Sequence, residues 1–267
     1  MIIVRIIGGL GNQMFQYAYA KALEASGKNV QIDLSKIKKY KLHGGYQLDK
    51  YNIDLKAASS LSVFLAKIGL IKSVKEKNSL FNENLLEVDG NTYVKGYFQT
   101  EKYFKEARKT ILSQFQQITA KGVSTLDYAK QINSTQSNCS LHVRRGDYVS
   151  KKINQTIHGV CSLDYYRAAI DHILSKESHT TFFVFSDDIE WTKENLNIEN
   201  VVFVDHKCTP HEDIYLMSLC KNNITANSSF SWWGAWLNQN KNKTVISPKQ
   251  WFVNKETNII CEDWIQL

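Results

Sequence analysis

The chain alternates short apolar runs with segments of helical periodicity, and this alternation constrains the fold more than any other feature. Apolar side chains recur at helical spacing at about residues 57–69, 101–117 and 164–174. Strands that alternate with helices predict an α/β fold with mostly parallel sheets, whose ligands bind at the carboxyl ends of the strands. The predicted strands lie at about residues 2–7, 30–34, 92–99, 139–143, 181–185, 201–204, 224–226 and 244–246.

The length of 267 residues is enough for two compact halves, each with its own core. Each half starts its own strand and helix alternation, and a polar stretch separates them. We place the division between residues 118 and 138, which gives expected domains 1–130 and 131–267.

Composition limits which cellular compartment and which class of binding partner we expect. The chain has 43% hydrophobic residues, but no apolar run of about 18 residues that could span a bilayer. Its five cysteines show no C-x-x-C pair, which favours a reducing cytoplasm and argues against a zinc site. The net charge of +7 fits a solvated lysine-rich surface, or attraction of an acidic substrate or of an anionic membrane face. No basic stripe interleaved with aromatics indicates nucleic acid binding.

The run from His142 to Asp147, which reads His-Val-Arg-Arg-Gly-Asp, follows a predicted strand. Two arginines at a strand end indicate an anion site, because guanidinium groups bind phosphate oxygens two at a time. Side chains alternate along a strand, so His142 and Arg144 are expected to face the ligand together. Arg145 either reaches the same anion or pairs with Asp147.

Two further motifs end neighbouring strands. Asp187 and Asp188 could hold a divalent metal, but a helix cap or contacts to a base or ribose fit better beside two arginines. Asn227, Ser228 and Ser229 have the composition of a helix cap, and the same turn offers hydroxyls and amides to phosphate. The tryptophans that follow, Trp232, Trp233 and Trp236, are expected to pack in the core.

The N-terminal strand runs into a glycine-rich turn, Gly8-Gly9-Leu10-Gly11-Asn12-Gln13, that opens a helix. With Asp33 after the second strand, the turn resembles part of a dinucleotide fingerprint. Met14 stands where that fingerprint has its third glycine, which disfavours NAD. We therefore interpret the turn as a close-approach loop in which Gly11, Asn12 and Gln13 face a ligand.

Together these motifs resemble the bacterial α-1,2-fucosyltransferases of glycosyltransferase family eleven, from Gly8 to about Trp251. The segments that resemble the family are His142–Val149, Gly8–Gln16, Phe185–Asp188 and Asn227–Trp233.

The resemblance implies two Rossmann-like domains facing each other across a cleft, the GT-B architecture, with the acceptor on the N-terminal and the donor on the C-terminal domain. It also implies a GDP-β-L-fucose donor, a galactoside acceptor in a surface glycan such as an O-antigen, a capsule or a Lewis-type glycan, and an inverting reaction with no metal or cofactor. The expected location is cytoplasmic, with peripheral membrane contact left open. Fucosylation at another linkage (α-1,3 or α-1,6) and an NAD-dependent oxidoreductase remain alternatives.

By the same resemblance, Arg144 holds the donor diphosphate and Asn12 lies near the reacting centre. Some relatives use a glutamate a few residues past the arginines as the general base. Residues 148–152 of this chain contain no aspartate or glutamate, so the general base is not assigned. Acceptor contacts are expected on the loop from 35 to 56. The candidate catalytic residues are Arg144, Asn12 and Asp147. The candidate donor-binding residues are Gly11, Gln13, His142, Arg145, Asp187, Asp188, Asn227, Ser228, Ser229 and Phe230.

Overall fold

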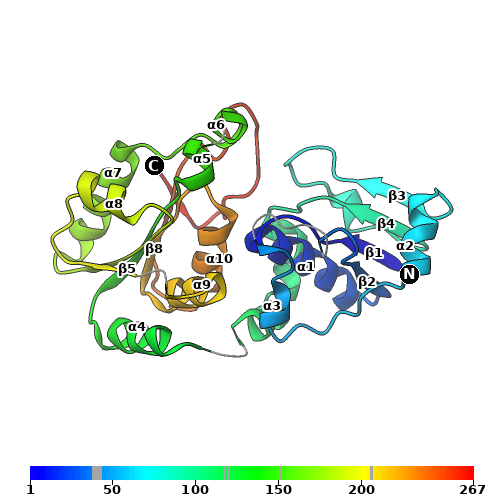
Figure 1. The fold of residues 1–267 in the computed structure, drawn as a ribbon, viewed down its shortest axis with the longest axis horizontal. Helices are drawn as coiled ribbons and strands as arrows, with labels where there is room; N and C mark the ends of the chain where they lie inside the picture. Colours follow the sequence, from blue (N-terminus) through cyan, green and yellow to red (C-terminus); the bar gives the residue numbers. More distant parts are fainter. Residues whose placement is uncertain (38–43, 117, 119–120, 151, 205–206) are drawn as a thin grey trace. The chain divides into compact units, whose positions relative to one another are not determined.

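The computed structural model describes residues 1–37, 44–116, 118, 121–150, 152–204 and 207–267, apart from the side chains at 147, 150, 153 and 154. The chain divides into two compact units (Figure 1). The first contains Met1–Thr119 and Glu256–Cys261, and the second contains Ala120–Lys255 and Glu262–Leu267. The expected division after residue 130 falls within helix α4 (Val123–Ser134), which packs against helix α9 (Pro210–Leu219) of the second unit.

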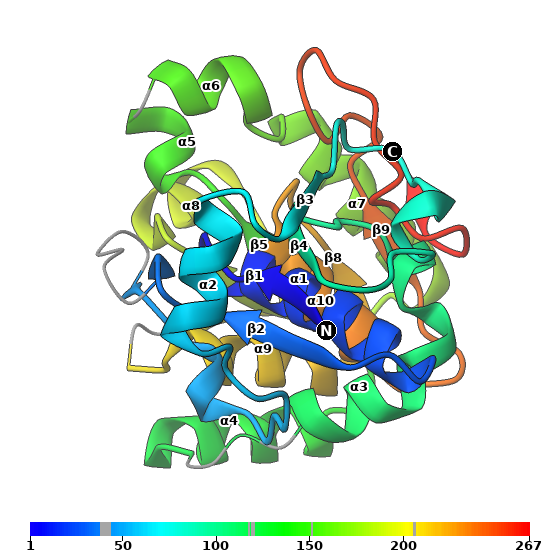
Figure 2. The same cartoon turned by 90° about the vertical axis from the view of Figure 1, so that its right-hand side faces the viewer.

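The first unit is built on a parallel sheet with strand order β2-β1-β4-β3, whose arrows lie side by side in Figures 1 and 2. The sheet interior is apolar, because Ile3, Val4 and Val94 are fully buried. Short 3-10 turns span Leu48–Lys50, Glu83–Leu85, Glu101–Tyr103 and Lys105–Ala107. The strands and helices are β1 (Ile2–Arg5), α1 (Leu10–Ala25), β2 (Val30–Asp33), α2 (Ser60–Lys67), β3 (Lys72–Lys75), β4 (Thr92–Lys95) and α3 (Arg108–Phe115).

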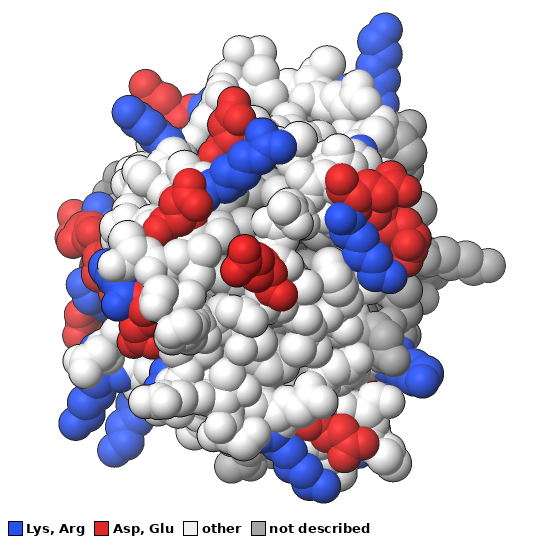
Figure 3. Space-filling view, turned by 90° about the vertical axis from the view of Figure 1, so that its left-hand side faces the viewer, with Lys and Arg blue, Asp and Glu red and all other residues white. Residues whose placement is uncertain are grey.

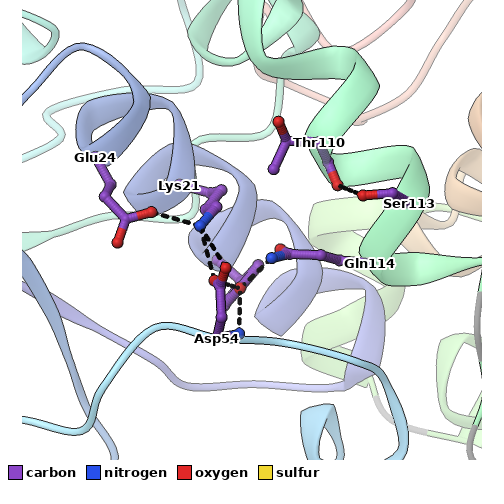
Figure 4. A network of polar contacts seen from close by, with 7 residues as sticks. Lys21, Glu24, Asp54, Thr110, Ser113 and Gln114 are labelled. Carbon is purple, nitrogen blue, oxygen red and sulfur yellow. Dashed lines mark hydrogen bonds and ion pairs between the residues drawn. The ribbon is translucent and has the colours of Figure 1, made fainter.

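A polar network fixes α1 against α3 and the chain before α2 (Figure 4). Lys21 Nζ donates to both carboxylate oxygens of Asp54, at 2.7 and 2.8 Å, and also contacts Glu24. The hydroxyl of Tyr17 lies 2.8 Å from Gln114 Oε1 and accepts the backbone N–H of Asp54. These contacts hold α1 in place, and with it the glycine-rich turn at its N-terminus.

The second unit is a six-stranded parallel sheet with the order β10-β9-β8-β5-β6-β7. Counted along the chain from β5, the first strand lies between the second and the fourth, which is the order of doubly wound nucleotide-binding folds. The strands are β5 (Asn138–Val143), β6 (Thr181–Ser186), β7 (Val201–Phe203), β8 (Asn222–Ile224), β9 (Val245–Ser247) and β10 (Ile265–Gln266). Besides α4 and α9, the helices are α5 (Gly146–Ser150), α6 (Lys152–His158), α7 (Leu163–Lys176), α8 (Ile189–Asn195) and α10 (Ser229–Leu237).

The cores explain why these elements form. In the second unit, Leu141, Val143 and Val184 of the central strands pack with the apolar side of α7 in one buried cluster. Helix α10 carries the three expected core tryptophans, which are buried and contact one another. Both units are therefore α/β with parallel sheets, as the alternation predicts.

Helix α2 lies within residues 57–69, where apolar side chains recur at helical spacing. Leu61 and Phe64 of this helix, and Ile68 just after it, are exposed. Its buried residues are Val63 and Ala66, because α2 covers only a small cluster around Ile3, Ile71 and Tyr93. The apolar stripe of α2 thus faces away from the core.

Surface and thiol chemistry agree with the composition. Figure 3 shows a face on which Lys and Arg side chains are interspersed with Asp and Glu. All five cysteines are free thiols. Within the described ranges, no helix combines the length and the apolar character that crossing a membrane requires.

Candidate active site

The carboxyl ends of β5 and β8 form the topological switch point of the second sheet. These strands are hydrogen-bonded neighbours, with Leu141 paired to Ile224. On the other side, Val143 of β5 pairs with Ser186 of β6. The three polar motifs of the second half therefore end adjacent strands at one sheet edge, where ligands of such folds bind.

Arg144 and Asp187 form an ion pair at this edge. Arg144 Nη1 lies 2.9 Å from Asp187 Oδ2, and both side chains are 27% exposed. The other carboxylate oxygen of Asp187 accepts the backbone N–H of Arg145 at 2.8 Å. Asp187 is thus held at two points and fixes one edge of the Arg144 guanidinium.

Gly146 leaves the space that this carboxylate occupies. A Cβ on residue 146 would lie 2.5 Å from Asp187 Oδ2, closer than real Cβ atoms approach, and 3.1 Å from its Cγ. The glycine of the Arg-Arg-Gly-Asp run is therefore required by packing against Asp187.

Arg145 turns to helix α8. Its Nε donates to Asp188 Oδ2 at 3.1 Å, and its guanidinium stacks on the Trp191 ring with 3.6 Å from Cζ to the centroid. Asp188 also caps α8 by accepting the N–H of Trp191. The structure thus gives Asp188 the helix-cap role and gives Arg145 an anchoring one. The alternative partner, Asp147, has its side chain outside the described residues.

His142 is buried beside the ion pair, with only 4% of its surface exposed. Its Nδ1 has no hydrogen-bond partner among the described residues, and its ring lies 5.5 Å from that of Phe230. Burial lowers the pKa of His142 to about 4, with Asp187 opposing this shift and Arg144 adding to it. The imidazole is therefore neutral near pH 7, and its Nδ1 is buried.

The turn after β8 contains Asn227, Ser228 and Ser229, which join neighbouring segments and begin helix α10. The side chain of Asn227 donates to the carbonyls of His158, Gly159 and Trp251, so it ties three segments together. Ser228 caps α10 by accepting the N–H of Phe230, and Ser229 begins the helix. No acidic residue stands in the first turn of α10, which leaves a positive helix end at the site.

The glycine-rich turn occupies the equivalent place in the first unit. Gly8 has a φ of +92°, and a Cβ there would lie 3.0 Å from Asn12 Nδ2. Gly11 lies in the first turn of α1 and is buried. Asn12 Oδ1 accepts from Gln99 Nε2 at 2.8 Å. The turn thus brings the backbone against the Asn12 side chain and orients it.

Gln13 connects the glycine-rich turn to the loop from 35 to 56, where acceptor contacts are expected. It is fully buried, donates to the carbonyls of Gly8 and Gly45 at 2.8 Å each, and accepts the N–H of Gln47 at 3.0 Å. Gln13 therefore acts as a scaffold between turn and loop. Residues 38–43 of that loop lie outside the described residues.

The geometry does not support dinucleotide binding in the first unit. Asp33, which would contact a ribose, is buried and instead accepts from the Tyr93 hydroxyl at 2.5 Å and from the Ser35 N–H. Met14 stands at the position of the fingerprint's third glycine, which would let helix and strand pack closely. Its side chain is fully buried beside Tyr51.

Sequence reasoning missed several supporting residues. Tyr148 lies under Arg144, 5.5 Å from guanidinium carbon to ring centroid, and its hydroxyl donates to the Asn227 carbonyl. Phe98, just after β4, has a φ of +51° and stacks on Tyr19 with centroids 3.9 Å apart. The contacts of Tyr148 with Asn227 and of Phe98 with Tyr19 join residues that are distant in sequence, so no spacing signal marks them.

Comparison with known proteins places this geometry in a family. Residues 1–267 match the sequence profile of glycosyl transferase family 11. An α-1,2-colitosyltransferase of Escherichia coli is 36% identical, covering 100% of this chain and 99% of that protein. The O-antigen biosynthesis glycosyltransferase WbnK of Escherichia coli is 32% identical, with 97% and 98% covered. Galactoside α-(1,2)-fucosyltransferase 2 of Rattus norvegicus is 26% identical, with 89% and 67% covered.

Solved structures agree on the fold. The fucosyltransferase NodZ from Bradyrhizobium superposes with a TM-score of 0.52 at 15% identity, covering 87% of this chain and 91% of that one. A NodZ α-1,6-fucosyltransferase crystal soaked with GDP-fucose gives 0.53 at 14% identity, with 88% and 91% covered. At this identity the likeness shows the GT-B type of fold and no more. With its two parallel sheets and its full-length sequence match, the chain belongs to glycosyl transferase family 11, the glycosyltransferases that include the galactoside α-1,2-fucosyltransferases and the α-1,2-colitosyltransferase.

Proposed function

We propose that the protein transfers L-fucose from GDP-β-L-fucose to the 2-hydroxyl of a galactoside in a surface glycan. The observation that supports this most is Arg144, fixed by Asp187 at the switch point of a doubly wound sheet. A guanidinium has five N–H donors, so an ion pair on one edge is compatible with bidentate contact to a phosphate on another. A nucleoside diphosphate is the sugar carrier that such a site suits.

The surrounding groups favour the same ligand. Helix α10 begins after β8, which is the neighbour of β5, and Arg144 follows β5. The positive N-terminus of α10, with Ser228 and Ser229, therefore suits a phosphate. His142 supplies a neutral imidazole, with Phe230 beside it. We therefore assign the donor to the second unit, with Arg145 and Asp188 as anchors, and the acceptor to the first.

The proposed reaction is a single displacement with inversion. The acceptor oxygen forms a bond to C1 of fucose as the bond from C1 to the diphosphate oxygen breaks, and GDP leaves with that electron pair. The transition state has oxocarbenium character. Arg144 stabilises the charge that grows on the diphosphate, a contribution of about 3 kcal/mol where one such donor is removed.

The acceptor hydroxyl also loses its proton. Asp147, two residues after Arg145, is our candidate for the catalytic carboxylate. Asn12 is the candidate from the glycine-rich turn, by resemblance to related fucosyltransferases. Asp147→Asn and Asn12→Ala should each lower kcat with little change in the affinity for GDP.

We further propose that the reaction needs no divalent metal. The two carboxylates with the spacing of a metal pair, Asp187 and Asp188, are each engaged by an arginine. Arginine charge thus takes the place that a cation would have on the diphosphate.

Colitose is the second candidate for the transferred sugar, because a relative at 36% identity over the full chain is named an α-1,2-colitosyltransferase. Colitose is the 3-deoxy counterpart of fucose. The two donors therefore differ by one hydroxyl, and a site that hydrogen-bonds this hydroxyl would discriminate strongly in favour of fucose.

One experiment tests both donors and the linkage. The purified protein is incubated with lactose and either GDP-fucose or GDP-colitose, and the product linkage is determined by NMR. We expect an α-1,2 product on galactose from GDP-fucose. An α-1,3 or α-1,6 product would refute the linkage, and a marked preference for GDP-colitose would replace the donor.

A further inference from the structure

Helix α2 of the first unit has an outer stripe of large apolar side chains. Leu61, Phe64 and Ile68 are 66%, 55% and 52% exposed, and Leu70 is 72% exposed. Positions i, i+3 and i+7 lie on one side of a helix, so the three helical side chains form one continuous stripe. Figure 2 shows α2 at the surface of its unit, facing the viewer.

Local structure holds this stripe firmly. Ser59 caps the helix start by accepting the N–H of Ser62. After the C-cap Ile68, Gly69 has a φ of +84°, and the N–H of Leu70 bonds back to the carbonyl of Leu65 at 3.0 Å. This is the Schellman type of helix end, which here places Leu70 beside the stripe instead of against the core. Four exposed apolar groups on so short a segment indicate a contact surface.

The segment that carries the stripe is basic. Residues 55–75 contain four lysines and no aspartate or glutamate, with Asp54 and Glu76 directly on either side. Lys67 lies on α2 itself and is exposed. Lys75 points to the same side of the sheet as α2, because it is two residues from Ser73, whose strand partner Tyr93 belongs to the cluster under α2. An apolar stripe flanked by lysines suits a lipid surface that has anionic headgroups above apolar acyl chains.

These features narrow the occupant. A second copy of the chain would place the same basic patch against itself, which adds like-charge repulsion. An added strand is disfavoured because β3, the edge strand, carries Lys72 and Lys75. At eight residues, α2 is about 12 Å long and cannot cross a bilayer, although it can lie in its surface.

We propose that the α2 stripe of Leu61, Phe64, Ile68 and Leu70, with Lys67 and Lys75, docks the first unit on an anionic lipid surface. The apolar side chains enter the boundary between headgroups and acyl chains, and the lysines contact lipid phosphates. This proposal is independent of which donor sugar the enzyme uses.

The test is flotation of the purified full-length protein with vesicles. Two compositions are used: phosphatidylcholine alone, and phosphatidylcholine with an equal amount of phosphatidylglycerol. We expect binding to the anionic vesicles, weakened by salt. Leu61→Ser with Phe64→Ser should reduce that binding about tenfold or more, and Lys67→Gln with Lys75→Gln about five-fold per lysine.

A matched control is Val123→Ser with Leu126→Ser on α4, which removes two exposed apolar side chains of the second unit. It should leave vesicle binding unchanged. Turnover of a soluble acceptor should be the same in the α2 variants as in the natural protein, which shows that they remain folded.

Three results would overturn the proposal. They are equal binding to both compositions, no binding to either, and self-association in solution that Leu61→Ser with Phe64→Ser abolishes.

Discussion

Gly146→Ala is the change whose effect follows most directly from the geometry around Arg144. The new Cβ would lie 2.5 Å from Asp187 Oδ2, and ordinary contact begins near 3.4 Å, so the carboxylate must move by about 0.9 Å. Asp187 is held between Arg144 Nη1 at 2.9 Å and the N–H of Arg145 at 2.8 Å. A shift of that size away from Arg144 would lengthen this contact from 2.9 Å to about 3.8 Å, beyond hydrogen-bond range.

The expected cost has two parts. Overpacking or loss of the charge-assisted contact lowers the free energy of unfolding by about 1–3 kcal/mol. A misplaced Arg144 weakens GDP binding by about tenfold, and it lowers transfer further because catalysis depends on placement within about 1 Å. Stability is measured by urea unfolding, GDP affinity by calorimetry, and transfer by release of GDP.

Two controls separate this effect from general destabilisation. Gly90→Ala puts a side chain at a φ of +60° with nothing within 4 Å, so it strains the first unit without touching Arg144. In an Asp187→Ala background the clash is gone, and Gly146→Ala should then change little. If Gly146→Ala alone binds GDP and transfers sugar as the natural protein does, our reasoning about Asp187 is refuted.

Three further outcomes are expected. Because burial lowers the pKa of His142 to about 4, below the ordinary value near 6.5, the unfolded chain binds this proton first and stability falls as pH drops from 6.5 to 4. The loss attributable to this residue has a limiting slope of about 1.4 kcal/mol per pH unit, and pH-dependent urea unfolding of His142→Gln should lack it. Arg145→Lys should lower the thermal midpoint by removing the stack on Trp191, and an unchanged midpoint would argue against anchoring. Transfer should continue in EDTA; activity lost there and restored by manganese would assign Asp187 and Asp188 to a metal.

The alternation of strands and helices could be predicted because it depends on local apolar patterns. Both sheets are parallel, and the motifs at His142, Asp187 and Asn227 end adjacent strands, as strand-end reasoning required. Two strands escaped prediction: β3 is lysine-rich and mostly exposed, and β10 has only two residues. Neither carries enough apolar character to stand out in sequence.

The roles of individual polar side chains were less predictable, because sequence shows which groups are present and not which are already hydrogen-bonded. Asn227 and Gln13 look like ligand contacts in sequence, yet both donate to backbone carbonyls within their own units. The helix predicted from apolar spacing at residues 57–69 is present as α2, but the spacing alone does not show which apolar side chains are buried. A helix can pack against the core with two small residues, here Val63 and Ala66, and leave larger apolar side chains exposed.

The central claim is that Arg144 binds the donor diphosphate. Transfer from GDP-fucose to lactose is measured for Arg144→Ala, with circular dichroism to confirm the fold. Arg167→Ala, which removes an exposed arginine paired to Asp164 on α7, is the matched control. The account predicts a loss in kcat/KM of about a hundredfold or more for Arg144→Ala and none for the control. Near-normal turnover by a folded Arg144→Ala protein would contradict it.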